Sequence, residues 1–153
     1  MADLRGNSTP VPAKYNALLI VAAGLSAIAA VLHVAIIIGG ASWYRFFGAG
    51  ERMASAAAAG QWYPPLVTAI IALILTIWGL YALSGAGVLQ KLPMLKPALC
   101  AITAVYLLRG LAIFPRLVIE PGQIALFDIW SSLICLVYGA VHLCGLVQVW
   151  RRI

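Results

Sequence analysis

Five polar or reactive side chains recur along the last apolar block of the chain: Asp128, Ser131, Cys135, Tyr138 and His142. Each residue of an α-helix turns by about 100°, so these spacings of three and four residues keep the side chains within an arc of roughly 80°. Polar groups that faced hydrocarbon would lose their hydrogen bonds. We therefore expect a cross-helix polar stripe that meets the rest of the protein or water.

Ionisable side chains in three different apolar blocks are expected at a similar depth in a membrane. At about 1.5 Å per residue, His33 lies roughly 8 Å and Arg109 roughly 9 Å below the outer ends of their blocks, and Asp128 lies within about one turn of that surface. Side chains at one depth can converge on an outward-facing polar pocket. The expected ligand-binding residues are His33, Tyr106, Arg109, Asp128 and Glu51, with Glu120 as a second loop carboxylate that could reach in.

Arg109 needs an explanation because a charged arginine costs about 2.5–3.5 kcal/mol at the centre of a membrane helix. It should have an acidic partner, reach the outer surface, or bind an anionic ligand. We expect Asp128 to be that partner. An Arg109–Asp128 pair could bind a ligand, or it could simply lock two helices together, since buried ionic groups often specify packing.

Catalysis on an apolar substrate needs only one or two ionisable groups facing a membrane pocket. His33 and Asp128 are the candidate acid and base for such a reaction. The chain has no phosphate loop and no GxSxG, HExxH or CxxC sequence, so no signature of a soluble enzyme supports a particular reaction.

The two histidines do not predict a metal or haem site. Counted along their blocks, His33 and His142 are about 16 Å apart in depth. A single metal ion binds imidazole nitrogens at about 2.0–2.1 Å, so both cannot bind one ion. We expect no metal and no cofactor, and we expect His142 to form a hydrogen bond across the bundle to Tyr81 or Ser84.

These side chains must be positioned by membrane-spanning helices. The chain is 64% hydrophobic and 9% charged, whereas soluble domains are about 25% charged. Blocks of about 20 apolar residues predict spans, and short connections make successive helices antiparallel neighbours. The expected fold is an all-α, up-down-up-down four-helix bundle. The expected segments are a disordered leader over 1–15, spans at about 16–39, 62–84, 97–115 and 125–149, and a basic tail over 150–153.

Two connections carry further predictions. Residues 40–61 contain Trp43, Tyr44, Phe46 and Phe47 beside Arg45, which suits an interfacial aromatic loop or lid with a short helix from Glu51 to Ala59. Pro115 should close the third helix, because proline cannot continue the helical hydrogen-bond ladder.

The net charge of +6 is spread in small groups beside the spans, so it indicates topology rather than a nucleic-acid surface. Six basic residues fall on the side of both termini and three on the other side: Arg5, Lys14, Lys91, Lys96, Arg151 and Arg152 against Arg45, Arg52 and Arg116. We expect both termini in the cytoplasm and an integral protein of a bacterial inner membrane.

The favoured function is binding of a lipid-like ligand or a partner subunit through the outward pocket, without turnover. So small a bundle has little surface to bury alone, which favours a homo-oligomer or a subunit of a complex in contact with membrane lipid. A membrane-embedded enzyme remains one alternative. A small solute or proton transporter, with a path from His33 and Arg109 along the stripe to His142, remains the other.

Overall fold

The computed structural model describes residues 15–119, 122 and 124–153, and in these residues it contains helices and no strand. Four stretches are long and apolar enough to cross a membrane: Ala17–Phe46, Tyr63–Gly85, Leu95–Ile119 and Leu126–Val149. The expected four-helix membrane bundle is confirmed, and the chain is an integral membrane protein. The helices are α1 (Ala17–Phe46), α2 (Glu51–Ala58), α3 (Tyr63–Gly85), α4 (Leu95–Leu111), α5 (Ile113–Ile119) and α6 (Leu126–Val149).

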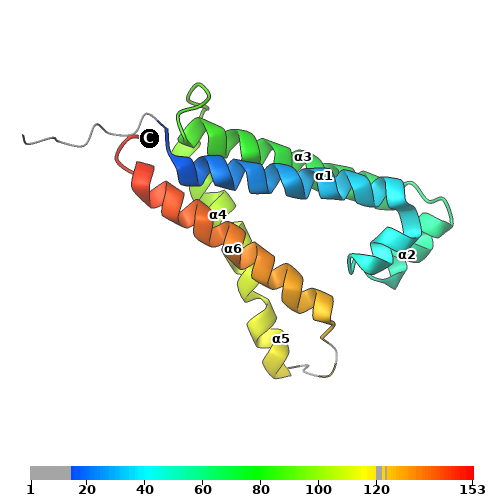
Figure 1. The fold of residues 1–153 in the computed structure, drawn as a ribbon. Helices are drawn as coiled ribbons and strands as arrows, with labels where there is room; N and C mark the ends of the chain where they lie inside the picture. The colour runs from blue at the N-terminus through cyan, green and yellow to red at the C-terminus, as the bar shows by residue number, and fades with distance from the viewer. Residues whose placement is uncertain (1–14, 120–121, 123) are drawn as a thin grey trace, which may run out of the picture.

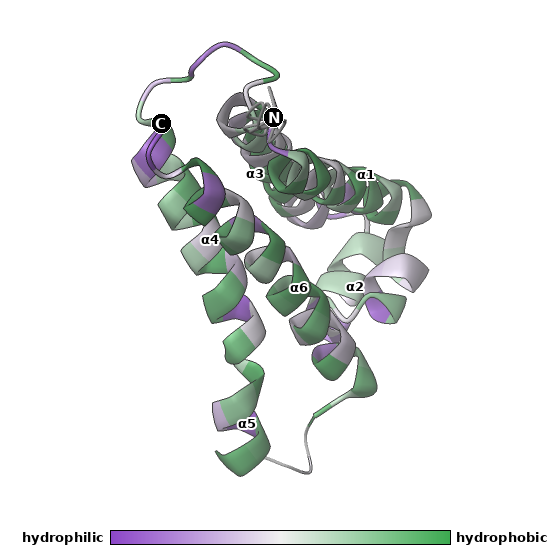
Figure 2. Cartoon of the chain, turned by 60° about the vertical axis from the view of Figure 1, so that its left-hand side comes forward, coloured by the Kyte–Doolittle hydropathy of each residue, from purple (hydrophilic) through white to green (hydrophobic). Residues whose placement is uncertain are grey.

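The four long helices form two antiparallel pairs (Figure 1). α1 packs mainly on α3, and α4 packs mainly on α6, while α1 also touches α6 and α3 touches α4. The pairs meet near the chain termini and diverge toward α2 and α5 (Figure 1). Hydrophobic residues cover most of the long helices, and hydrophilic residues gather mainly near their ends (Figure 2). This distribution fits a bundle whose outer faces meet lipid.

The end of the bundle near the termini, which we call the terminal end, is the best-packed region. Leu19, Leu99 and Leu146 from three helices are buried together there. Asn16 joins the two pairs, because its backbone N–H donates to Ala86 O at 3.0 Å and its Nδ2 donates to Gln148 Oε1 at 2.7 Å. Its side-chain oxygen also accepts the Leu19 N–H and so begins α1. The terminal end therefore fixes how the pairs meet.

At the opposite end, α1 breaks and then continues. Gly40 has a φ of 64°, a conformation open to glycine at little cost, so the helix changes direction before the aromatic segment that follows. That segment is helical rather than a loop. Tyr44 is buried against Ile36 and Ala54, and its hydroxyl lies 3.1 Å from Thr68 Oγ1. α2 covers this corner, in agreement with the short helix expected there.

The third span is longer than expected because a second helix continues it beyond a break. α4 ends at Leu111, and the chain continues as α5 to Ile119. Pro115 therefore does not close the span. It lies at the third position of α5, where a backbone N–H has no partner within the helix, so the missing donor costs little. The helical ladder is interrupted after Leu111, whose carbonyl oxygen would accept the N–H of residue 115 in a continuous helix, so the break lies where a proline at 115 disrupts the ladder.

α4 and α6 approach closely through a reciprocal contact of glycine and leucine. Leu107 of α4 lies against Gly139 of α6, and Leu136 of α6 lies against Gly110 of α4. A Cβ atom built on Gly110 would lie 2.8 Å from the backbone nitrogen of Leu136. Small residues allow membrane helices to approach in this way, and here they set the spacing of the pair that carries Arg109.

Candidate functional site

An aromatic cluster lies at the centre of the bundle. The Tyr106 ring contacts the rings of Trp78, Tyr138 and His142, with centroids 5.0, 5.5 and 5.1 Å apart. The Tyr106 hydroxyl is hydrogen-bonded to Ser26 Oγ at 3.1 Å, which links α4 to α1. Tyr106 and Ser26 are buried, so the bond is made away from lipid. This contact helps to join the two helix pairs.

His142 belongs to this cluster and is fully buried. Its Nδ1–H donates to the Tyr138 carbonyl oxygen one turn earlier, at 2.9 Å. Nε2 is the buried side-chain nitrogen or oxygen that lacks a hydrogen-bond partner in the described part of the chain. A neutral ring that donates through Nδ1 has an acceptor at Nε2, so this acceptor is unpaired.

The hydrogen bond expected from His142 to Tyr81 or Ser84 is wrong. The Tyr81 hydroxyl donates to Pro93 O at 3.2 Å, and the Ser84 hydroxyl donates to Gln90 O at 2.8 Å. Both groups are used by the connection between α3 and α4, whose backbone needs partners because it has no helical ladder of its own.

Arg109 extends from α4 toward α6. Its Nη1 donates to Ser132 Oγ and its Nη2 to Ser131 Oγ, both at 3.3 Å. These bonds are longer than usual, and they use two of the five N–H donors of the guanidinium. No carboxylate lies within ion-pair distance of Arg109 in the described residues, and Glu120, the second loop carboxylate, lies outside them. Because α5 extends the span to Ile119, Arg109 lies about 15 Å along the helix from that end, deeper than expected.

The expected pairing of Arg109 with Asp128 is wrong. The Asp128 carboxylate pairs with Arg116 Nη2 at 3.5 Å, and it accepts the Ala125 N–H at 3.2 Å at the start of α6. Arg116 follows Arg109 by two helical turns and therefore reaches the end of the bundle where Asp128 lies. An acidic group in the first turn is also stabilised by the helix dipole.

The other two proposed ligand-binding residues lie apart from Arg109. His33 is half-buried, and its Nδ1–H donates to Ala29 O within α1 at 2.7 Å. Glu51 begins α2. No hydrogen bond or ion pair joins any two of the five proposed ligand-binding residues in the described residues. His33 and Asp128, the candidate acid and base, are among the pairs left unjoined.

Glu51 is held by a bidentate ion pair with Arg45 at the α1–α2 corner. Arg45 Nη2 donates to Oε1 at 2.7 Å, and Nε donates to Oε2 at 3.0 Å. Ser55 Oγ donates to Oε1 at 2.8 Å. These hydrogen bonds lower the pKa of the Glu51 carboxyl to about 2, and the hydrogen bonding from Arg45 has the largest effect. Both side chains are at least half exposed, so their role is local.

The polar stripe on α6 faces the protein. His142 is buried, and Asp128, Ser131, Cys135 and Tyr138 are half-buried. Ser132 and Trp78 were not predicted as site residues, although Ser132 accepts a hydrogen bond from Arg109 and Trp78 contacts the Tyr106 ring. Ser132 was identifiable only as the neighbour of Ser131, because a buried serine in an apolar block could equally bond its own backbone.

No group of three or more His, Cys, Asp or Glu side chains in the described residues could hold a metal ion. Comparison of the whole chain with protein-family models, curated proteins and solved structures finds no match.

Proposed function

We propose that this protein binds a lipid-like ligand with an anionic or hydrogen-bond-accepting head at Arg109, without turnover of its own. The observation that carries the proposal is an exposed guanidinium inside a membrane span, held by two serine hydroxyls at 3.3 Å and by no described carboxylate. A charge at this depth is costly unless an anion compensates it.

The neighbouring ion pair supports this choice of residue. Arg116 is neutralised by Asp128, so its charge is already balanced. Arg109 has three N–H donors beyond its two serine bonds, and a planar guanidinium can bind phosphate or carboxylate through two parallel hydrogen bonds. Ser131 and Ser132 orient the group from the facing helix.

The basic residues near the termini outnumber those at the opposite end, which favours a cytoplasmic terminal end. The proposed ligand then enters from the outer side of a bacterial inner membrane. The ligand can be a free lipid, or the lipid-like part of a partner subunit in a membrane complex.

Native mass spectrometry of protein released from vesicles of bacterial polar lipid extract tests the proposal. The wild-type protein should carry a lipid adduct at Arg109, and Arg109→Gln should therefore carry one bound lipid fewer than the wild type. Arg116→Gln is the matched control, because it removes the same charge at a residue that already has a partner. A bare wild-type protein, or an equal number of bound lipids in the wild type and in Arg109→Gln, would contradict the proposal.

A further inference from the structure

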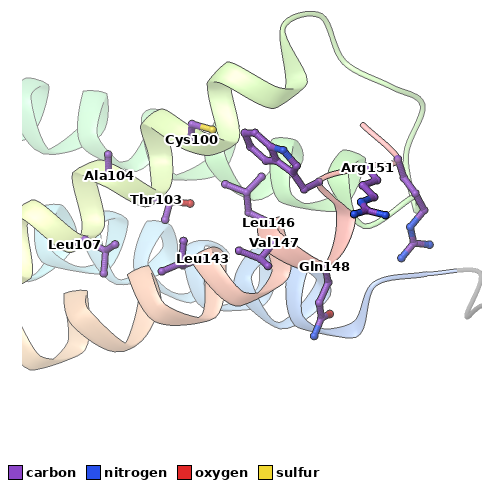
Figure 3. A pocket seen from close by; sticks show the side chains of 11 residues that line it. Cys100, Thr103, Ala104, Leu107, Leu143, Leu146, Val147, Gln148 and Arg151 are labelled. Atoms are coloured by element: carbon purple, nitrogen blue, oxygen red, sulfur yellow. The ribbon is translucent and has the colours of Figure 1, made fainter.

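A second feature lies at the other end of the α4–α6 pair. A groove of about 800 Å³ runs between these helices at the terminal end. Its walls are mainly apolar, and Ala104, Leu143 and Val147 are exposed on its surface. Leu107 and Leu143 lie at the inner end of the groove, and Gln148 and Arg151 lie at its mouth (Figure 3). From Leu143 to Trp150 the groove follows about 10 Å of helix.

The groove is suited to an apolar chain. Its polar wall residue, Thr103, already donates its hydroxyl hydrogen to Leu99 O at 2.7 Å. Small side chains at Cys100 and Ala104 leave the space open on the α4 side. Ligand pockets of about 300–1,000 Å³ are typical of small molecules, so part of a lipid fits this volume.

The mouth of the groove is basic. Arg151 and Arg152 line it, and Lys96 Nζ lies 4.2 Å from the centroid of the Trp150 ring at the same end. The two described acidic side chains, Glu51 and Asp128, lie at the opposite end and are already paired with arginines. The mouth therefore has a positive potential where lipid head groups lie, and tryptophan is common at this level of a membrane protein.

We propose that this groove is a binding site for one anionic phospholipid of the leaflet at the terminal end. An acyl chain lies between α4 and α6, and the phosphate is bound by Arg151 and Arg152. Basic pockets between membrane helices recognise anionic head groups in this way. The site is separate from Arg109 and does not depend on the proposed function.

A groove between α1 and α3 provides an internal comparison. It has a volume of about 540 Å³ and is lined by apolar and small residues, among them Ala27, Gly79 and Leu83. Among the described residues, no basic side chain lines it. It therefore offers a similar wall without the charged mouth, and it should show no preference for anionic lipid.

The test uses full-length protein in nanodiscs made from equal parts of phosphatidylglycerol and phosphatidylcholine, with the retained lipid identified by native mass spectrometry. All variants are made in protein that also carries Arg109→Gln, which removes the other proposed lipid site, and there we expect one retained phosphatidylglycerol. In Arg151→Gln/Arg152→Gln its affinity should fall by about 30-fold, since each basic residue near the surface is worth about fivefold. Arg45→Gln/Arg52→Gln removes the same charge at the opposite end and should retain the lipid.

Ala104→Phe tests the apolar part of the site by filling the groove, and Ala27→Phe fills the α1–α3 groove as its control. Retention should fall in Ala104→Phe and persist in Ala27→Phe and in Arg109→Gln. The proposal is overturned by equal retention of both lipids, by equal loss in the two arginine double variants, or by phosphatidylglycerol that survives Ala104→Phe. A second protein chain in place of the lipid would also overturn it.

Discussion

The reciprocal glycine contact between α4 and α6 gives the sharpest prediction about stability. Gly110→Ala places a methyl group 2.8 Å from the backbone nitrogen of Leu136 and 2.6 Å from its Cγ atom. The side chain of Leu136 could rotate away, but its backbone nitrogen moves only with α6 itself. The substitution should therefore push α4 and α6 apart.

The expected size follows from two opposing effects. Alanine favours a helix over glycine by about 0.8–1.0 kcal/mol, whereas overpacking of a close contact costs about 1–3 kcal/mol. Gly110→Ala should then lower the free energy of unfolding by about 1 kcal/mol. Gly24→Ala is the matched control on α1, because a Cβ atom there meets nothing within 4 Å. That control should leave the free energy of unfolding unchanged or raise it by up to about 1 kcal/mol.

Unfolding in mixed micelles with increasing sodium dodecyl sulfate, followed by far-ultraviolet circular dichroism, measures both variants against the wild type. The difference between Gly24→Ala and Gly110→Ala isolates the packing cost, since the intrinsic gain from alanine is common to both. Equal stability of the two variants would show that α4 and α6 do not approach as closely as described.

Two further outcomes follow from other contacts. An unpaired buried acceptor costs about 1–3 kcal/mol, and His142→Leu removes one, so this variant should not lower the free energy of unfolding. Tyr106→Phe deletes the bond to Ser26 and should lower the free energy of unfolding by about 1 kcal/mol. The same micelle titration compares the two variants, and a larger loss of stability in His142→Leu would mean that Nε2 is hydrogen-bonded. The Glu51 carboxyl has a pKa lowered to about 2, so the Arg45–Glu51 pair should protect α2 fully above the unfolded pKa near 4.5 and lose this effect as the pH falls toward 2. Hydrogen exchange over residues 51–58, corrected for intrinsic rates, should show that loss in the wild type and not in Glu51→Gln, and identical pH profiles would refute it.

The spans were predictable because their signal is repeated over many residues. Long apolar blocks define them. The prolines lie in the first turn of α3, within a few residues of the expected start of that span, and Gly40 marks the break in α1 where the first span was expected to end. Pro115 was misjudged because proline has two allowed roles. In the interior of a helix its ring clashes with the carbonyl group four residues earlier and ends the helix, but in the first turn it is tolerated. Only the break after Leu111 shows which role applies to Pro115.

The pairing of polar groups was less predictable than their placement. Helical spacing correctly put the α6 stripe toward the protein, since angular position depends on local geometry alone. The partner of Asp128 depended instead on the depth of Arg109, which changed when α5 lengthened the span. Likewise, the hydrogen-bond acceptors of Tyr81 and Ser84 lie in the connection between α3 and α4. Sequence periodicity does not predict the path of such a connection.

The division into two helix pairs bears on the order in which the protein can assemble during synthesis. Chains fold from the N-terminus as they are made, and α1 finds its main neighbour once α3 has been synthesised up to Gly85. The second pair needs α6, which is synthesised after the other five helices. The bond from Asn16 to Gln148 can close only after α6 has been synthesised as far as Gln148. Premature termination before α6 would thus leave the α1–α3 pair complete and α4 without its main packing partner.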